Sequence, residues 1–252
     1  MRRTARYGWI PDRPDKRDEK FCVCGAAHLQ AQLTRDWSIG MPPAWDQGQI
    51  GSCTGNMFAA QALFLRRRQG DPEIMPSRLF SYWAARVREG TTDSDAGAQI
   101  RDIIAGAITE GICPEDLWPY DPARVTLEPS SEAFERAQYC EVLDYQRVDN
   151  TIEEQLVAAM IIGPLCFGAA IYDSFESAEV QRTGMVPMPK PDESMAGGHA
   201  LWLCQLDLGR RLGKVRNSWG PRWGQQGYCW FPLDYLTDGD LADDFWLVRQ
   251  LT

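Results

Sequence analysis

Three short segments of the chain carry residues whose types could together perform covalent chemistry. Cys53 follows a glycine-rich turn, His199 follows two glycines, and Asn217 opens a stretch rich in tryptophan and glycine. A thiol becomes a good nucleophile at neutral pH when a base takes its proton and a third group orients that base. Cys, His and Asn in this order indicate acyl-transfer chemistry, and peptide-bond hydrolysis is the reaction that we favour.

The turn before Cys53 suits a nucleophile. A helix is expected to begin at about Thr54, and the partial positive charge at its N-terminus would favour the thiolate form of Cys53. Gln47 lies six residues earlier (53 − 47 = 6). Its amide could donate to an oxyanion, with the Cys53 backbone N–H as the second donor. The alternative role for Gln47 is an amide that caps the loop.

The base has only two candidates, because the chain contains two histidines, His28 and His199. We favour His199, since it opens an expected buried strand and the glycines at 197–198 leave room for a substrate. Asn217 would accept the ring N–H of His199 and fix its tautomer. Trp219 would shield that hydrogen bond from water, although core packing alone could also explain a tryptophan there.

The elements that must position these residues change character halfway along the chain. Apolar residues at helical spacing fill the first half, and strand-like apolar runs fill the second. The expected helices cover about 54–68, a segment after Ser77, about 98–109, and 152–162 with Thr151 and Glu154 as a capping box; the expected strands cover 165–172, 200–206, 214–217, 227–231 and 245–249. This order predicts an α+β fold with a cleft between two lobes.

Composition excludes several classes of protein. With 252 residues, 44% hydrophobic and 24% charged, the chain is expected to be globular, with one domain of two lobes or two small domains. A net charge of -9 argues against a nucleic-acid partner. No apolar run is long enough to span a bilayer. The basic start lacks the apolar stretch of a Sec signal peptide, so we expect a cytoplasmic protein or one exported by another route.

The eight cysteines are scattered, and most are expected to be reduced and buried. That expectation is strongest for Cys166, Cys204 and Cys229, which lie in apolar strand-like runs. Cys22 and Cys24, with His28, would supply half of a zinc site, but no second pair of ligands stands nearby. We therefore expect no metal and no cofactor.

Residues 1–30 are charged and rich in proline, and we call them the N-terminal arm. They are expected to form an extension without a core of its own, ahead of a catalytic domain at 31–252. A complete catalytic set behind such an arm suggests an inhibitory pro-segment that contacts the cleft.

Taken together, the motifs resemble those of the papain-like (C1 family) cysteine peptidases. The matching residues are Gln-Gly-x-x-Gly-Ser-Cys at 47–53, Gly-His-Ala at 198–200 and Asn-Ser-Trp-Gly-x-x-Trp-Gly-x-x-Gly-Tyr at 217–228. The first residues of the chain resemble the bacterial, xylellain-like branch of the family. In that branch a short N-terminal segment takes the place of the long pro-domain and lies over the cleft.

The resemblance implies a helical left lobe, an antiparallel β-barrel-like right lobe, and an active-site cleft between them. It implies that Cys53 attacks the scissile carbonyl, and that His199 protonates the leaving amine and then activates water. Gln47 and the Cys53 N–H would stabilise the oxyanion. Gly97, Gly198 and Trp219 would contact a protein or peptide substrate.

The chain also departs from the plant and lysosomal members of the family. Ile50 stands where they have a disulfide cysteine, and the stretch from Asp95 to Ala98 replaces their Cys-x-Gly-Gly. These changes suit a reducing compartment and put the family's first disulfide in doubt. Small and apolar residues near Ala98, 168–169 and 195–196 favour an apolar side chain in the main specificity pocket.

Two other functions remain open at this point. The chain could be a binding or regulatory protein that uses a peptidase fold without turnover, because a fold alone does not prove a function. It could also catalyse a different acyl transfer, such as transamidation or the hydrolysis of a side-chain amide, because the acceptor decides the outcome.

Overall fold

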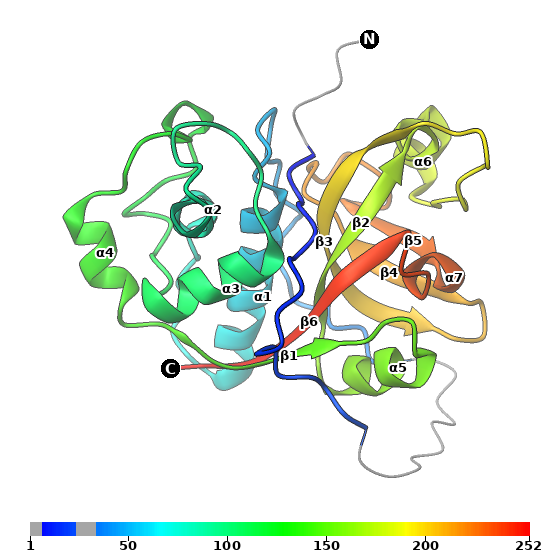
Figure 1. The fold of residues 1–252 in the computed structure, drawn as a ribbon, viewed down its shortest axis with the longest axis horizontal. Helices are drawn as coiled ribbons and strands as arrows, with labels where there is room; N and C mark the ends of the chain where they lie inside the picture. The colour runs from blue at the N-terminus through cyan, green and yellow to red at the C-terminus, as the bar shows by residue number, and fades with distance from the viewer. Residues whose placement is uncertain (1–6, 24–33) are drawn as a thin grey trace.

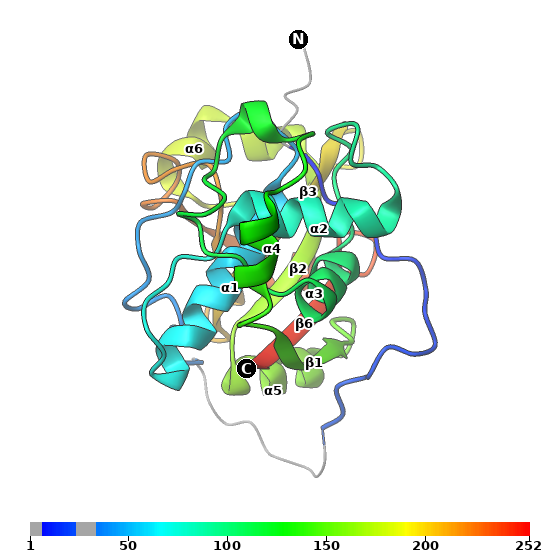
Figure 2. The same ribbon diagram turned by 90° about the vertical axis from the view of Figure 1, so that its left-hand side faces the viewer.

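The computed structural model describes residues 7–23 and 34–252, which form two lobes (Figure 1). One lobe is helical and the other is built on an antiparallel sheet, so the predicted α+β fold is confirmed. The helical lobe contains α1 (Cys53–Gln69), α2 (Arg78–Glu89), α3 (Ile100–Thr109) and α4 (Ser131–Ala137). Figure 2 shows this lobe from its outer side, with β2, β3 and β6 behind the helices.

Helix α1 is the central element of the fold. It is buried along most of its length, and Gln61 at its middle joins it to the sheet. The Gln61 amide accepts a hydrogen bond from Trp202 Nε1 at 2.7 Å and donates to the Val248 carbonyl at 2.6 Å. The helix ends at Gly70 in the left-handed conformation, after three arginines in its last turn, as the sequence predicts.

The second lobe is a six-stranded sheet in the order β1-β6-β2-β3-β4-β5, with every pair antiparallel. Its strands are β1 (Val142–Val148), β2 (Leu165–Tyr172), β3 (Met195–Asp207), β4 (Leu212–Arg216), β5 (Tyr228–Pro232) and β6 (Ala242–Leu251). Among the described residues the sheet is not closed into a barrel, so the expected barrel-like lobe is corrected to an open sheet.

Short helices pack on the sheet lobe: α5 (Glu153–Ile162), α6 (Ala178–Thr183) and α7 (Leu233–Leu236), with a 3-10 turn at Asp173–Glu176. A second 3-10 turn, Pro122–Arg124, belongs to the helical lobe. The predicted capping box of α5 is wrong. The N-cap is Ile152, which has no side-chain cap, and the Thr151 hydroxyl donates to Asp149 at 2.6 Å. The Thr151 N–H donates to the same Asp149 oxygen at 3.1 Å, so Thr151 forms a local turn with Asp149, and the N-cap falls on the next residue.

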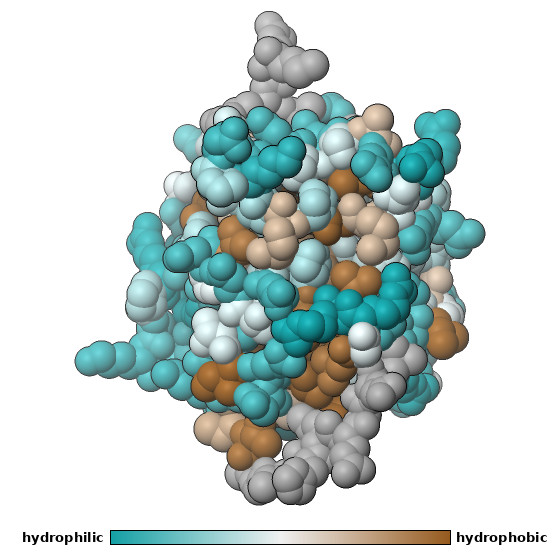
Figure 3. Space-filling model, turned by 90° about the vertical axis from the view of Figure 1, so that its right-hand side faces the viewer, coloured by the Kyte–Doolittle hydropathy of each residue, from teal (hydrophilic) through white to brown (hydrophobic). Residues whose placement is uncertain are grey.

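The core lies where the sheet meets α1. Its largest buried side chains include Trp202 and Trp246 from neighbouring parts of the sheet. Cys166, Cys204 and Cys229 are buried and free of disulfides, which confirms their predicted role as small apolar residues. The outer face of the sheet lobe is mainly hydrophilic, with hydrophobic residues in separate patches (Figure 3). None of the helices in the described residues has the length and hydropathy needed to cross a bilayer.

The described part of the N-terminal arm, residues 7–23, runs between the two lobes (Figure 1). It pairs with the helical lobe through a parallel bridge from Trp9 to Ala98 and with the sheet through one from Lys20 to Arg147. Farther along the arm, the Asp18 carboxylate accepts hydrogen bonds from Nε (2.8 Å) and Nη2 (2.5 Å) of Arg101, which belongs to α3. The arm is therefore held by both lobes at once.

Candidate active site

Cys53 is the first residue of α1, and the turn before it is held from outside. The Gly51 N–H donates to Asp95 Oδ2 at 2.8 Å, and Asp95 Oδ1 accepts from the Tyr82 hydroxyl at 2.7 Å. The Ser52 hydroxyl lies 2.5 Å from the Tyr120 hydroxyl. These contacts fix the turn against the helical lobe.

The Cys53 thiol is fully buried with the arm in place. Burial raises its pKa to about 11, against the opposing effect of the backbone amides of Ala200 and Gly8. The Ala200 N–H lies 3.4 Å from Sγ. The helix N-terminus was expected to favour the thiolate, but in this arrangement desolvation is the larger effect and the thiol stays protonated at neutral pH.

His199 lies on β3, next to Ala200, and is fully buried. Its Nε2 is 2.8 Å from Asn217 Oδ1. The same oxygen lies 2.7 Å from the Ser218 N–H, which can only donate, so the Asn217 atom at this point must be an acceptor. The His199 ring therefore carries its proton on Nε2 and leaves the Nδ1 lone pair to act as the base.

Trp219 covers the His199–Asn217 pair. Its ring centroid lies 5.2 Å from that of His199 with the planes tilted by 35°, and its side chain is buried. Phe175 packs edge-on against Trp219 at 5.3 Å. These rings pack over the hydrogen bond, whose two partners are buried, and they also belong to the hydrophobic core.

Gln47 joins the nucleophile turn to the segment that carries Asn217. Its N–H donates to the Ser218 carbonyl at 2.8 Å, and its Oε1 accepts from the Ser218 hydroxyl at 2.5 Å. Its Nε2 donates to the Ile50 carbonyl at 2.8 Å. The side-chain oxygen is thus fixed on Ser218, which turns the nitrogen end toward the turn that leads to Cys53.

The two predicted backbone-binding glycines behave differently. The Gly198 carbonyl accepts from the Trp9 N–H at 3.0 Å. The Gly97 N–H instead donates to the Tyr82 hydroxyl at 2.9 Å, and the pairing with the arm falls on the next residue, Ala98. Ala98 donates to the Gly8 carbonyl at 2.8 Å and accepts from the Ile10 N–H at 3.1 Å.

Gly97 has a different use in the structure. Its φ is +82°, and a Cβ at this position would lie 2.5 Å from the Gly8 carbonyl oxygen. Only glycine lets another backbone come this close in this conformation. Gly97 therefore permits the approach of an extended chain, and Ala98 makes the hydrogen bonds.

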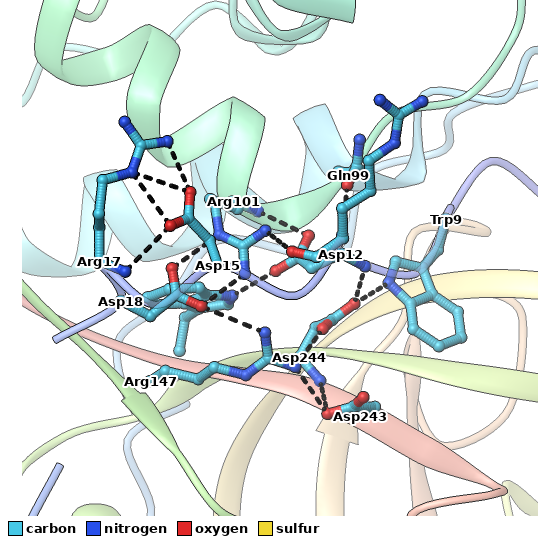
Figure 4. Close-up of polar contacts among 12 residues, drawn as sticks. Trp9, Asp12, Asp15, Arg17, Asp18, Gln99, Arg101, Arg147, Asp243 and Asp244 are labelled. Atoms are coloured by element: carbon cyan, nitrogen blue, oxygen red, sulfur yellow. Dashed lines mark hydrogen bonds and ion pairs between the residues drawn. The ribbon is translucent and has the colours of Figure 1, made fainter. Parts of the chain in front are cut away.

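Three arm residues lie directly over the site. The Tyr7 ring is 5.9 Å from the centroids of both His199 and Trp219. A Cβ on Gly8 would lie 1.7 Å from the Gly51 carbonyl oxygen, so Gly8 is pressed against the turn before Cys53. Trp9 is buried, and its Nε1 donates to Asp244 at 3.0 Å (Figure 4).

Asp95 and Asp244 support or line the site, and sequence reasoning did not assign them a role. Ala98 was expected only as a wall of the specificity pocket, and not as the residue that pairs with an extended chain. Asp95 and Ala98 flank Gly97, so that stretch was noted, but a hydrogen bond from Asp95 to a turn 44 positions earlier leaves no local signal. Asp244 lies in an apolar strand, where a buried acid is rare, and that rarity was a usable signal. Cys24 and His28 lie outside the described residues.

Comparisons with known proteins agree with this geometry. No family model matches the chain. It is 35% identical to an uncharacterized peptidase C1-like protein, L477, of Acanthamoeba polyphaga mimivirus, over 99% of this chain and 88% of that protein. Cysteine proteinase 1 of Entamoeba histolytica is 26% identical, over 86% of this chain and 68% of that protein.

Solved structures give the same result. Xylellain, a cysteine protease from Xylella fastidiosa, is 34% identical with a TM-score of 0.90, covering 99% of this chain and 98% of xylellain. The bromelain protease of Ananas comosus, solved with the inhibitor E64, is 18% identical with a TM-score of 0.64 over 86% of this chain and 98% of that chain, and it shares the fold. The chain therefore belongs to the papain-like (C1) family of cysteine peptidases.

Proposed function

We propose that the chain hydrolyses peptide bonds with Cys53 as nucleophile, His199 as acid and base, and Asn217 as the group that orients His199. The observation that carries the proposal is the fixed tautomer of His199, which leaves Nδ1 as a basic nitrogen. The next residue, Ala200, donates its backbone N–H to Cys53 Sγ, so the base and the nucleophile belong to adjoining segments. Cys53 would attack the scissile carbonyl, and the resulting acyl-enzyme would be hydrolysed by water that His199 activates.

Gln47 is proposed to stabilise the oxyanion together with the Cys53 backbone N–H. Ser218 holds the Gln47 oxygen, so the amide nitrogen faces the turn, where it donates one hydrogen to the Ile50 carbonyl and would donate the other to the oxyanion. Preorganised donors of this kind stabilise the charge that develops in the transition state. No cofactor is required by this mechanism.

A direct test uses peptides and an analysis of the products. Hydrolysis releases a new carboxylate, whereas transamidation in the presence of an added amine gives an amine-linked product. We expect free carboxylates, with activity lost in Cys53→Ala and unchanged in Cys22→Ala, which alters an exposed thiol outside the proposed catalytic set. Mainly amine-linked products would favour a transamidase, and no turnover by a folded, arm-released chain would favour a binding protein.

The arm, residues 1–30, is proposed to keep the enzyme latent by occupying the substrate groove. Its backbone uses the Ala98 and Gly198 groups that an extended substrate would need. The Gly8 carbonyl points to the Ala98 N–H, and the Gly8 N–H faces the thiol. The arm thus presents a backbone N–H, and not a carbonyl carbon, to the Cys53 thiol. This explains how the arm could block the groove without being cleaved.

Latency can be tested in the full chain by the substitution Gly8→Ala, which adds one methyl group to the arm. Gly8→Ala places a Cβ where only 1.7 Å separates it from the Gly51 carbonyl oxygen, so the arm must leave the turn. We expect this variant to hydrolyse peptides at least tenfold faster than the parent. The clash should weaken docking of the arm by at least the free energy of one buried contact, about 1.4 kcal/mol, and this corresponds to a tenfold larger fraction of open enzyme. Ile10→Ala, which truncates a partly exposed side chain of the same arm, should stay latent. Equal activity of the parent and a folded Gly8→Ala variant would remove the arm from the mechanism.

A further inference from the structure

The side chain of Trp9 fills a pocket cut into the face of the sheet. A Cβ on Gly168 of β2 would lie 1.9 Å from Trp9 Cε2, and one on Gly198 of β3 would lie 2.9 Å from Trp9 Cε3. Both glycines therefore make room for one large, flat side chain. The pocket lies beside the Ala98 and Gly198 backbone groups that pair with the arm, so a side chain there belongs to the extended segment in the groove.

The floor of this pocket is an acid, Asp244, whose side chain is fully buried. A bulge in β6 directs it there. Cys166 pairs with Trp246 but Gly168 pairs with Asp243, so β6 has one residue more than β2 in this interval. Asp244 takes a φ of +56°, and bulges of this kind turn a side chain out of the regular alternation. Figure 4 shows its carboxylate facing the indole of Trp9.

The two oxygens of Asp244 have different partners. Oδ1 accepts from Arg147 at 2.7 Å, and Arg147 belongs to the sheet. Oδ2 accepts from Trp9 Nε1 at 3.0 Å and from the Asp12 N–H at 2.7 Å, and both of these donors belong to the arm. When the arm leaves, Oδ1 keeps its arginine and Oδ2 loses both contacts. Water can solvate Oδ2 in the open pocket, but a side chain that fills the pocket excludes that water. A carboxylate oxygen that is desolvated without a donor is costly, so the pocket favours a side chain that brings an N–H group.

We propose that Asp244 makes the main specificity pocket, which Trp9 fills in this structure, prefer large residues with a nitrogen donor, namely arginine, lysine and tryptophan. The inference rests on the proposed function, in which the arm occupies the substrate groove. It replaces the expectation of an apolar side chain, which was drawn from the walls near Ala98, 168–169 and 195–196. The walls do admit apolar atoms, and the floor adds a requirement for a donor at the tip of the side chain.

The test measures a ratio of rates within one enzyme. Peptides in which each position near the scissile bond is varied in turn are hydrolysed by the full-length Gly8→Ala chain, comparing arginine with norleucine, and tryptophan with phenylalanine. The first member of each pair carries the nitrogen donor and is also larger, and the Asp244→Asn variant separates the effect of the donor from that of size. At one position we expect the donor-bearing residue to have a kcat/KM about 10–100-fold higher, the usual worth of a hydrogen bond to a charged group.

The matched variants are Asp244→Asn and Asp243→Asn, each in the Gly8→Ala chain. Asp243 is the neighbouring residue, also bonds Arg147, and is about half exposed, with 47% of its side chain accessible. We expect Asp244→Asn to reduce the arginine-to-norleucine ratio to within about threefold of one, and Asp243→Asn to keep it high. The ratio does not depend on how much of each variant is folded.

Two results would overturn the inference while leaving the proposed function intact: rapid hydrolysis with norleucine as good as arginine at every position, or a preference for arginine that survives Asp244→Asn. Absence of hydrolysis for every peptide, by a folded chain whose Cys53 also resists labelling, would instead defeat the proposed function and the inference with it.

Discussion

The hydrogen bond between His199 and Asn217 shows how single residues set the chemistry of the site. Asn217 Oδ1 receives the Ser218 N–H as well as the ring, so its orientation does not depend on His199. The imidazole is therefore held in one tautomer even before a substrate arrives. The residue types and their order were readable from the sequence, because catalysis constrains them tightly.

Asn217→Ala is expected to reduce kcat about tenfold in the Gly8→Ala chain. A neutral hydrogen bond contributes about 0.5–1.5 kcal/mol, and about 1.4 kcal/mol corresponds to a factor of ten. The readout is the pH profile of kcat/KM, in which the limb due to His199 should move because its Nε2 proton has lost its acceptor. A reduced rate with an unmoved profile would show a merely structural role for Asn217.

Gln47→Glu keeps the size of the side chain but removes its N–H donors and adds negative charge beside the oxyanion. We expect kcat to fall by about 10²–10³, the usual loss when one such donor is removed. Gln49→Glu is the matched control, since Gln49 lies in the same turn and is exposed. Nearly unchanged turnover in Gln47→Glu would restrict Gln47 to holding Ser218.

At the scale of elements, the turn before α1 shows what sequence reasoning could and could not reach. The start of α1, its end at Gly70 and the strand around His199 were predicted, because glycines and apolar runs mark them locally. The anchoring of Gly51 by Asp95 was not, because that contact joins segments far apart in the chain. Strand β1 (Val142–Val148) was also missed, since most of its residues are only half-buried and its apolar pattern is weak.

Asp95→Ala tests this anchor. The change leaves the Gly51 N–H and the Tyr82 hydroxyl without their acceptor, so the free energy of unfolding should fall by about 1–3 kcal/mol. Turnover should fall as well, because Gly51 lies two residues before Cys53. Urea denaturation and kcat/KM in the Gly8→Ala chain measure the two effects. Asp93→Ala, an exposed acid in the same loop, should change neither, and an Asp95→Ala enzyme of full activity would contradict the assigned role.

For the molecule as a whole, the contact between the arm and both lobes contains more acids than bases. Asp12 and Asp18 from the arm meet Asp243 and Asp244 of β6, with Arg101 and Arg147 between them (Figure 4). Burial, then the charge of Asp12, raises the pKa of Asp244 to about 7. Burial also raises the pKa of Asp12. Glu89, on α2 beside this contact, has its pKa raised to about 7, again chiefly by burial.

Docking of the arm is therefore expected to weaken as the pH rises through about 7. Asp244 and Asp12 would return toward an ordinary pKa near 3.9 once the arm leaves and water enters. A carboxyl whose pKa is higher in the docked state binds a proton on docking, so its contribution is complete below about pH 4 and is lost as the pH passes its docked pKa.

The measurement is the activity of the parent divided by that of Gly8→Ala at each pH, since the quotient cancels the pH dependence of the chemistry itself. We expect it to increase between pH 5.5 and 8.5, by at most about tenfold per pH unit for each proton released. Asp244→Asn in both chains should flatten the rise. A quotient that increases toward acid pH would show that docking depends on ionised carboxylates instead.

The most direct measurement of the whole mechanism is mass-resolved labelling by E-64 at pH 7, on the parent, Gly8→Ala and Cys53→Ala chains. With the arm docked, Cys53 is buried and its pKa is raised to about 11, so the parent should react slowly. Gly8→Ala should take up one equivalent at Cys53 rapidly, and Cys53→Ala none. A folded Gly8→Ala chain that remains unlabelled, or is labelled only at the exposed Cys22, would contradict an activated thiol gated by the arm.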